Sequence, residues 1–282
     1  MKFFLFTLLI LFTFQQQTDY ITFPISKTTN PTPIIKHTII NQENKENEKN
    51  TTGNLFIIQN PINHFHFLPP NGGCPGMVRT TETAKTNNCT LATNAGFFDM
   101  VTGECLGNFI SNGEIIQHLS FKRSNFGLTK DGNYLFGYLQ DQDVLDLGFN
   151  DLVSGSVWLV RNGKSYVEES VKIEQPSSNF VTEKAPRVAI GHDKSGFLMI
   201  LAVNGLESDD YGLDLYQFAD LSISLGFVNA LNLDGGGSET AWFQNKIWNT
   251  CSDLCTSKDI QFHCPNTQIR CQRAVTTITC VK

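Results

Sequence analysis

Residues 231–242 read LNLDGGGSETAW, and the rest of the chain is organised around this stretch. A short apolar run leads into Asp234, three glycines follow, and Ser238 and Thr240 flank Glu239. Three glycines at the end of a strand indicate a backbone that takes positive φ or lies very close to another group. Successive N–H groups in such a loop can converge on an anion, such as a phosphate. A glycine-rich β-turn capped by Asp234 explains the same residues equally well.

Length and charge limit the class of protein. The chain has 282 residues, and its apolar content is ordinary for a globular protein, so it can form a large core. Its formal net charge is −6, and the sequence has no block rich in Lys and Arg. This argues against a protein that binds nucleic acid by neutralising its phosphates.

The N-terminus is typical of a secretory signal. Residues 1–14 read MKFFLFTLLILFTF, in which one lysine precedes an apolar run too short to span a bilayer. We therefore predict a signal peptide at 1–17, with a retained signal anchor as the alternative. We expect no stable membrane span after signal removal, because no later apolar run has membrane length. Eight cysteines and glycosylation sequons at Asn50 and Asn88 also fit an oxidising compartment.

Local patterns predict the organisation of the folded part. Residues 18–54 form a polar N-terminal segment, predicted to be a tail or flexible insertion, with a short strand at 38–40 as an alternative. The folded domain is expected at 55–282. A short helix is predicted at 80–86 and a longer amphipathic helix at 213–225. Turn pairs between β-rich runs predict hairpins at Asn112-Gly113, Asp131-Gly132, Asn162-Gly163 and Ser195-Gly196. The predicted class is a single α+β domain with mostly antiparallel, hairpin-rich sheets, a few helices and disulfides.

Three polar clusters lie at the ends of predicted strands. Together they supply an amide, an arginine fork, a histidine, carboxylates and a glycine loop, a set suited to a sugar that carries a phosphate. The clusters are NAGFF at 94–98 with ECLGN at 104–108, RVAIGHD at 187–193, and the opening stretch. Ser238 lacks the G-x-S-x-G motif of a hydrolase elbow, and no metal-ligand spacing is convincing. We therefore expect neither a metal nor a cofactor.

Each candidate residue also has a structural interpretation. Asn94 can bond a neighbouring backbone in a turn, and Glu104 can be a surface residue beside a cysteine. Arg187 can form a structural ion pair. His192 is better explained as part of the turn that follows it, because a lone histidine without a partner in the sequence proves little.

The motifs resemble one protein family. NAGFF (94–98), TGECLGN (102–108), VWLVRNG (157–163), RVAIGHD (187–193) and NLDGGGSET (232–240) occur in this order in the phosphodiester glycosidase family. The resemblance runs from about Leu55 to the end of the chain. It implies a hydrolase that removes N-acetylglucosamine (GlcNAc) from GlcNAc-α-1-phospho-6-mannose diesters on N-glycans and so exposes mannose 6-phosphate.

The resemblance also implies a partner and a location. The partner would be a phosphorylated glycan on glycoproteins, met in the secretory pathway (the Golgi or a lysosome-related lumen) or after secretion. A homo-oligomer is left open. The alternatives are a glycosidase that cleaves another sugar-1-phosphodiester in a surface or secreted polysaccharide, and a non-catalytic phosphoglycan-binding protein.

Roles for individual residues follow from the resemblance. It implies that Asp234 and Glu104 are the candidate catalytic carboxylates and that Arg187 stabilises the phosphate. Other substrate contacts are expected from Asn94, Gly96, His192, Gly235, Gly236, Gly237, Ser238 and Thr240. Glu239 stands where a small residue is expected, which would change the charge beside the phosphate.

The resemblance further implies three disulfides. They join Cys74 to Cys105, Cys89 to Cys280, and Cys264 to Cys271. The remaining cysteines, Cys251 and Cys255, would then form a small loop or stay free.

Overall fold

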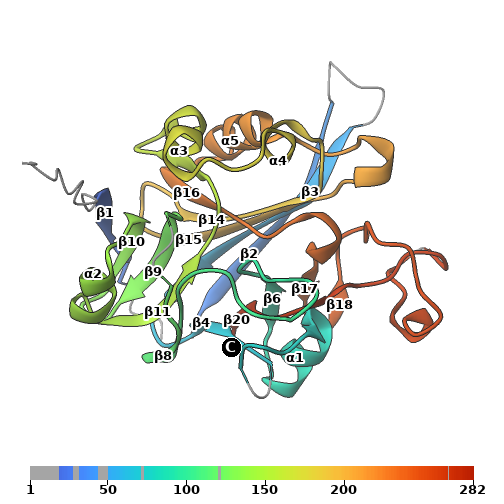
Figure 1. The fold of residues 1–282 in the computed structure, drawn as a ribbon, viewed down its shortest axis with the longest axis horizontal. Coiled ribbons are helices and arrows are strands. Elements are labelled where there is room, and N and C mark those ends of the chain that lie inside the picture. Colours follow the sequence, from blue (N-terminus) through green and yellow to red (C-terminus); the bar gives the residue numbers. More distant parts are fainter. Residues whose placement is uncertain (1–18, 28–31, 44–49, 71–72, 120–121, 266) are drawn as a thin grey trace, which may run out of the picture.

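A seven-stranded sheet forms the middle layer of the computed structural model, which describes residues 19–27, 32–43, 50–70, 73–119, 122–265 and 267–282. Its strands are, in spatial order, β13 (Lys164–Ser165), β12 (Trp158–Arg161), β16 (Asn229–Leu233), β14 (Arg187–His192), β15 (Leu198–Val203), β3 (Thr51–Gln59) and β2 (Ile34–Gln42). Helices α3 (Val167–Glu174), α4 (Ser178–Thr182) and α5 (Leu215–Ser224) cover one face of this sheet (Figure 1).

Two further sheets lie against the other face (Figure 1). One contains β1 (Asp19–Pro24), β10 (Asn133–Tyr138), β9 (Asn125–Thr129), β11 (Phe149–Ser154), β7 (Phe109–Ser111) and β8 (Glu114–Gln117). The other contains β18 (Lys246–Ile247), β17 (Ala241–Phe243), β6 (Leu91–Asn94), β20 (Ile278–Val281) and β4 (Phe65–Leu68). Helix α2 (Asp141–Asp146) packs on the first and α1 (Thr80–Thr86) on the second, while β5 (Val78–Arg79) pairs with β19 (Ala274–Val275). The predicted α+β class with antiparallel sheets is confirmed.

Apolar side chains from all three sheets form the main core. Phe56 and Ile190 come from the middle sheet, Phe126 from the six-stranded sheet, and Phe67 from the five-stranded sheet, and all are fully buried. A second core lies between the middle sheet and its helices. Strands β14 and β16 are therefore buried on both faces, and the segments at their ends are the parts that reach solvent.

The predicted hairpins and helices are confirmed. Asn112 and Gly113 both have positive φ (49° and 80°), as do Asn162 and Gly163 (52° and 74°), which matches a type I′ turn. Helix α5 begins after Asp214, whose side chain accepts a hydrogen bond from the Gln217 N–H at 2.8 Å. This cap and the apolar stripe explain why the helix forms at this place.

The expectation of a tail or flexible insertion at 18–54 is wrong for two segments, and the alternative of a strand at 38–40 is confirmed within β2. β1 pairs with β10, and β2 pairs with β3 over nine positions. Alternation along β2 buries Ile40 and exposes Ile39, so a segment of polar composition still presents one face that packs. The predicted signal peptide at 1–17 and residues 44–49 lie outside the described residues. Among the described residues, no helix is both long and apolar enough to cross a bilayer.

Two of the three expected disulfides are present. Cys74 is bonded to Cys105 and Cys89 to Cys280. The expected Cys264–Cys271 pair is wrong, because Cys251 is bonded to Cys264 and Cys255 to Cys271. Neither Cys251 nor Cys255 is free.

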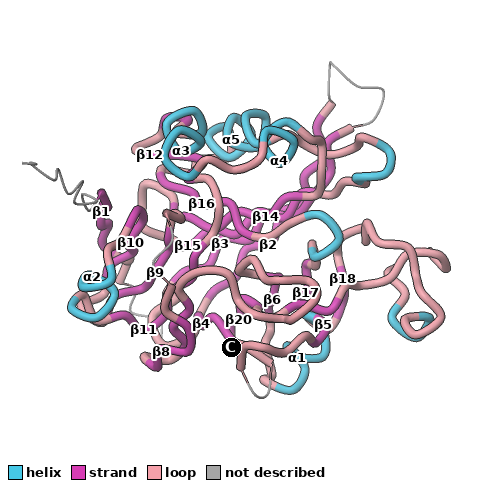
Figure 2. Tube along the Cα trace, in the orientation of Figure 1, coloured by secondary structure: helices cyan, strands magenta, loops and turns pink. Residues whose placement is uncertain are grey.

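Strand geometry explains this exchange of partners. His263 lies opposite Cys271 in an antiparallel bridge, so the neighbouring Cys264 points to the other face. Leu254 lies opposite Arg270, which puts Cys255 and Cys271 on one face. Together, the two disulfides close residues 251–271 into a loop-rich segment at one side of the molecule, here called the hook (Figure 2).

The disulfides differ in how much of the chain they close. Cys89–Cys280 joins residues 191 positions apart, and Cys255–Cys271 joins residues 16 apart. In the chain-entropy model the longer loop stabilises the fold by about 2 kcal/mol more. We expect replacing both Cys89 and Cys280 with serine to lower the free energy of unfolding by about that much more than replacing Cys255 and Cys271. Urea denaturation without reductant measures both losses, and equal losses would contradict the expectation.

Candidate active site

One amide side chain holds both ends of the glycine loop, residues 234–240. Asn94, at the end of β6, donates from Nδ2 to the Asp234 carbonyl at 2.6 Å. Its Oδ1 accepts from the Thr240 N–H at 3.1 Å. The Asp234 N–H also donates to the Ala95 carbonyl at 2.9 Å. Asn94 thus bonds neighbouring backbone groups, as its structural interpretation predicted. These bonds join the NAGFF segment to the loop.

Close neighbours surround the three glycines. A Cβ on Gly235 would clash with the Pro186 carbonyl, and one on Gly236 would clash with the Glu207 carboxylate. A Cβ on Gly237 would clash with Asp253 and Arg273. Gly236 also has a φ of 57°, which few other residues adopt. The glycines therefore let charged side chains approach the backbone of the loop.

Most N–H groups of the loop already have acceptors inside the protein. The Gly235 N–H donates to Oδ1 of Asp234 at 3.0 Å and the Gly236 N–H to the Pro186 carbonyl at 2.9 Å. The Ser238 and Glu239 N–H groups donate to carbonyls within the loop. The loop therefore differs from the expected anion cradle, and its charged neighbours must supply any contact to a phosphate.

Asp234 is the central titratable group. Its pKa is raised to about 6, mainly by burial and also by the carboxylate of Glu207, while Arg273 acts in the opposite direction. The Ser238 hydroxyl is close enough to lower the pKa of Asp234. Among the described residues, however, the Ser238 Oγ has no partner in full hydrogen-bond geometry. A carboxyl with a pKa near 6 can both accept and donate a proton close to neutral pH.

Glu207, in the 3-10 turn η1 (Glu207–Asp209), is a second carboxylate at the loop. Burial raises its pKa, Arg273 lowers it, and Glu183 and Asp253 raise it. Arg273 is held in a two-point ion pair by Asp253, with N···O distances of 2.7 and 2.8 Å. The loop is thus surrounded by two carboxyls with raised pKa and by one oriented guanidinium.

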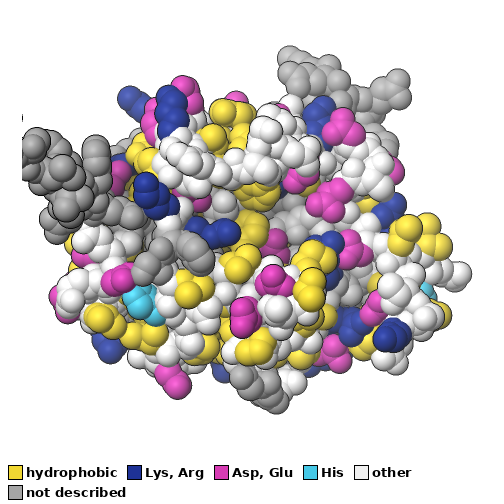
Figure 3. All heavy atoms as spheres, in the orientation of Figure 1, with side chains coloured by type: hydrophobic (Ala, Val, Ile, Leu, Met, Phe, Trp, Pro, Cys, Tyr) yellow, Lys and Arg dark blue, Asp and Glu magenta, His cyan; other side chains and the backbone are white. Residues whose placement is uncertain are grey.

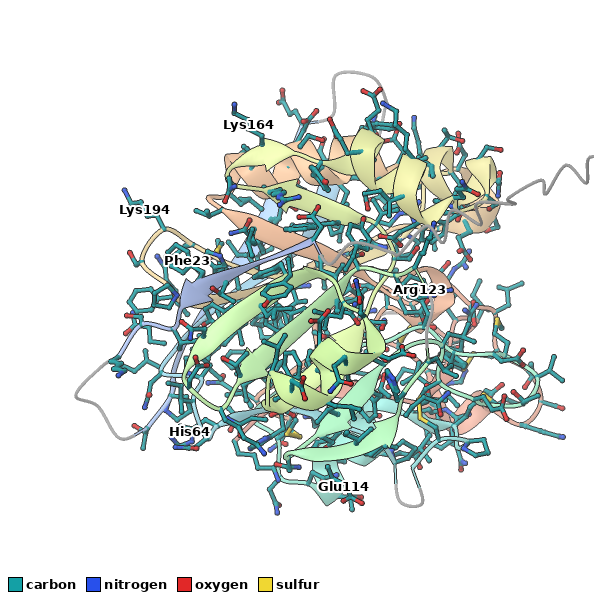
Figure 4. All side chains as sticks on the ribbon, turned by 60° about the vertical axis from the view of Figure 1, so that its left-hand side comes forward. Phe23, His64, Glu114, Arg123, Lys164 and Lys194 are labelled. Atoms are coloured by element: carbon teal, nitrogen blue, oxygen red, sulfur yellow. A yellow bond between two sulfur atoms is a disulfide. The ribbon has the colours of Figure 1, made fainter. Side chains whose placement is uncertain are left out.

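A pocket of about 500 Å³, here called the basic pocket, lies beside this cluster. Its lining includes Phe97, Lys122, Arg123, Ser156, Glu174 and Phe180. Burial lowers the pKa of Arg123, whereas the carboxylates of Glu174 and Asp234 raise it, so this guanidinium is within electrostatic reach of both. Figure 3 shows basic side chains in a hollow between the helices and the loops below them, and Figure 4 labels Arg123.

Arg187 lies in the site region, but backbone groups occupy its donors. Nε donates to the Leu213 carbonyl at 3.0 Å, and Nη2 donates to the carbonyls of Phe180 and Glu183 at 3.1 and 2.8 Å. Burial lowers its pKa. These bonds fix the segment that carries Phe180, so Arg187 shapes the basic pocket from behind.

Three other predicted residues lie elsewhere or face the interior. His192 is at the far end of β14, stacked on Phe23 at 4.1 Å and bonded to Asn229. Figure 4 shows Phe23 well apart from Arg123. Glu104 is exposed in a turn, where its carbonyl accepts from the Asp99 N–H. Gly96 packs against the six-stranded sheet, with its N–H bonded to Thr277 Oγ1 at 2.8 Å. His192 lies away from Asp234, whereas Gly96 follows Ala95, whose carbonyl accepts the Asp234 N–H.

Glu239 does not add charge to the loop surface. Its side chain is fully buried, and Oε2 accepts from Asn249 Nδ2 at 2.9 Å. Burial raises the pKa of Glu239 well above its ordinary value, which favours the neutral acid. Thr240 is buried as well. Glu239 therefore does not change the charge beside the phosphate, contrary to the expectation from the sequence.

Sequence reasoning missed the residues that approach the loop from other segments. They are Lys122, Arg123, Glu207, Asp253 and Arg273. A weak signal was present in the adjacent basic pair at 122–123 and in the acidic run ESDD at 207–210. For Asp253 and Arg273 we find no signal, since their meeting depends on the hook.

One group of potential metal ligands lies in the described part of the chain, but it is outside this site. Ligand atoms of Cys255, His263 and Cys271 lie within 4.8 Å of one another. The two cysteines are joined in a disulfide, so their thiolates are not available to an ion.

Comparison with known proteins places these features in a family context. A family model described as phosphodiester glycosidase matches residues 87–282. The N-acetylglucosamine-1-phosphodiester alpha-N-acetylglucosaminidases of Bos taurus and Homo sapiens are 38% and 36% identical over 243 and 248 residues, which is 81% and 83% of this chain. The chain spans less than half the length of these relatives, 44% and 46%.

A solved structure shows the same fold. It is the zebrafish N-acetylglucosamine-1-phosphodiester alpha-N-acetylglucosaminidase catalytic domain, described as auto-inhibited by its pro-peptide. The TM-score is 0.82 at 34% identity, and the match covers 93% of this chain and 87% of that one.

The raised pKa of Asp234 predicts a pH-dependent stability difference. An unfolded aspartate titrates near 3.8 and the folded one near 6, so ionisation opposes folding as the pH rises through this window. We expect Asp234→Asn to be more stable than the wild type at pH 8 by up to about 3 kcal/mol, with the difference vanishing below about pH 4. Urea denaturation at several pH values measures it, with Asp209→Asn as an exposed control. A difference that does not vary with pH would contradict the assignment.

Proposed function

Because this chain belongs to the phosphodiester glycosidase family, we propose that it is a hydrolase that removes GlcNAc from GlcNAc-α-1-phospho-6-mannose diesters on N-glycans, exposing mannose 6-phosphate. The observation that carries the proposal is Asp234, a carboxyl with a pKa of about 6 between Glu207 and the cations Arg273 and Arg123. The activity for which the relatives from Bos taurus and Homo sapiens are named supports the choice of the sugar and of the phosphodiester.

The phosphate is the first group that the site must stabilise. When the sugar–oxygen bond breaks, the leaving group is a phosphate monoester, which is a weak base and needs little protonation. Its growing negative charge needs cations instead. Arg123 and Lys122 line the basic pocket, and Arg273 is fixed by Asp253 beside Gly237. We assign the phosphate to Arg123 and Lys122, with Arg273 completing the positive wall.

The two carboxyls, Asp234 and Glu207, have different roles at the sugar carbon. Asp234 is mostly ionised at neutral pH and is still basic enough to take a proton from the attacking water. The carboxylate of Glu207, in η1, lies against Gly236 of the same loop. It would stabilise positive charge at the sugar ring. Most glycosidases use a pair of carboxyl groups that lie in different environments. We place Glu207 rather than Glu104 in this pair because the Glu207 carboxylate lies against Gly236 of the loop.

The setting follows from the same proposal. The substrate partner would be a phosphorylated glycan on a glycoprotein, and the four disulfides support an oxidising lumen or the extracellular space as the place of action. No cofactor enters the proposed chemistry.

Replacing either proposed carboxyl tests the mechanism. We expect Asp234→Asn to lower kcat for GlcNAc-α-1-phospho-6-(methyl mannoside) by at least about 100-fold, since it removes the proton acceptor, and Glu207→Gln to lower it by a comparable factor. Release of GlcNAc by purified protein is the measurement, and Asp209→Asn is the control from the same turn.

The result for Glu104 separates the two assignments of the second carboxyl. A loss in Glu104→Gln as large as that in Asp234→Asn, with Glu207→Gln active, would restore Glu104 to the mechanism. Near-native turnover by Asp234→Asn would remove Asp234 from it. Failure of the wild type to release GlcNAc from any diester would reject the proposed activity.

The basic pocket makes a separate prediction. A charged hydrogen bond to phosphate is worth about 1.5–3 kcal/mol, so Arg123→Gln should lower kcat/KM for the diester by about 10- to 100-fold. Lys164→Gln is the matched control, because Lys164 is exposed at the end of β13 and lies far from Arg123 in Figure 4. Equal kcat/KM values for the two variants would contradict the assignment of the phosphate to this pocket.

A further inference from the structure

Residues 88–90 read Asn-Cys-Thr, an acceptor sequence for N-linked glycosylation whose middle residue forms a disulfide. They connect helix α1 to strand β6. Asn88 and Thr90 are exposed, whereas Cys89 between them is buried and bonded to Cys280. The two residues that define the acceptor sequence therefore face solvent, although the residue between them is fixed inside the domain.

The side chain of Asn88 makes no structural bond that a glycan would displace. Its backbone has a φ of 56°, a left-handed conformation common at helix ends, and its N–H donates to the Lys85 carbonyl at 3.2 Å. The neighbouring Asn87 instead uses its side chain, which donates to the Thr83 carbonyl at 2.9 Å. Neither the Asn88 amide nor the Thr90 hydroxyl is hydrogen-bonded to another described residue. Glycine would meet the backbone requirement at position 88 equally well, so the conformation alone does not explain the amide.

A glycan at Asn88 would leave the proposed active site open. Asn88 precedes β6, whereas Asn94, which bonds the glycine loop, is the last residue of that strand. The amide of Asn88 therefore lies toward the end of β6 that is away from Asp234. Figure 1 shows α1 at the opposite edge of the molecule from α3 and α4, which border the basic pocket.

The folded domain holds the backbone of the acceptor sequence from several sides. The Cys89 N–H donates to the Ala84 carbonyl at 2.9 Å, and the Thr90 N–H donates to the Val281 carbonyl at 2.7 Å. The Thr90 carbonyl in turn accepts from the Gln244 N–H at 2.9 Å. An enzyme that transfers a glycan must bind the acceptor sequence as a separate segment. These bonds and the disulfide prevent such binding, so the transfer has to precede them.

Synthesis from the N-terminus provides an interval in which neither constraint exists. Cys280 follows Cys89 by 191 residues. At synthesis rates of roughly 5–20 residues per second, this separation corresponds to about 10–40 s. Strand β20, whose Val281 accepts the Thr90 N–H, is made equally late. During this interval the acceptor sequence lacks both its native disulfide and its contact with β20.

We propose that Asn88 carries an N-linked glycan that is added during synthesis, and that Cys89 pairs with Cys280 afterwards. In the transfer, Nδ2 of Asn88 forms a bond to C1 of the first sugar of an oligosaccharide carried on a lipid diphosphate. The bond between C1 and the diphosphate oxygen breaks, the lipid diphosphate leaves with the electron pair, and Nδ2 loses one proton. The inference requires delivery to the lumen of the secretory pathway and does not depend on the proposed enzymatic activity.

Peptide mapping of the full chain, expressed in insect cells and taken from total cell protein, tests the modification. We expect most Asn88 peptides to carry a glycan and, without reduction, to be joined to the peptide that contains Cys280. Thr90→Ala should lower the glycosylated fraction at least about tenfold, and Asn88→Gly should abolish it while suiting the local φ. Thr52→Ala, in the other acceptor sequence, is the matched control and should leave Asn88 glycosylated.

Replacing Cys280 with serine tests the order of the two steps. Because the glycan is added first, Cys280→Ser should show the same glycosylated fraction at Asn88 as the wild type, and so should the control Cys271→Ser. Misfolding of either variant does not disturb this measurement, since the transfer precedes folding. A wild type that is mostly bare at Asn88 overturns the proposal, and so does a glycosylated peptide in which Cys89 is not joined to Cys280. A glycosylated fraction that rises in Cys280→Ser alone overturns the order, because the disulfide would then form first.

Discussion

The two hydrogen bonds of the Asn94 side chain are the interaction on which the site depends. They join the carbonyl at the start of the glycine loop and the N–H at its end to the last residue of β6. Because β6 belongs to the five-stranded sheet and β16 to the middle sheet, this amide ties two layers of the fold together at the loop. An asparagine that has both a donor and an acceptor can make this pair of bonds, and an aspartate cannot.

Once the loop is held there, its glycines determine what can surround it. Side chains of Glu207, Asp253 and Arg273 lie where Cβ atoms would be in any other residue. Burial raises the pKa of Asp234 and has the largest effect, Arg273 lowers the pKa, and Glu207 raises it. A carboxyl of this kind costs stability when ionised, which is a common feature of groups placed for proton transfer.

The disulfides hold in place the segments that carry Asn94 and Asp253. Cys89–Cys280 fixes β20 beside β6, the strand that carries Asn94. The two disulfides of the hook hold a segment with little regular structure against the domain, and this segment provides Asp253, the ion-pair partner of Arg273. The pairing of Cys255 with Cys271 rather than Cys264 with Cys271 follows from the side of the isolated β-bridges on which each side chain lies.

The sequence by itself determined the elements whose causes are local. Turn pairs such as Asn112-Gly113 and Asn162-Gly163 define hairpins through the backbone angles that they favour, and the apolar stripe with its Asp214 cap defines α5. The ordered motifs also identified the family, and they gave Asp234, together with Glu104, as a candidate catalytic carboxyl. Only the tertiary structure decided which partners meet Asp234. Glu207 and Arg273 are 27 and 39 residues away from it in either direction, and His192, on the adjacent strand, points to the far end of the sheet. Which of these residues lie close to Asp234 in space depends on the order of the strands and on the hook. A pattern within a short stretch of sequence does not predict it.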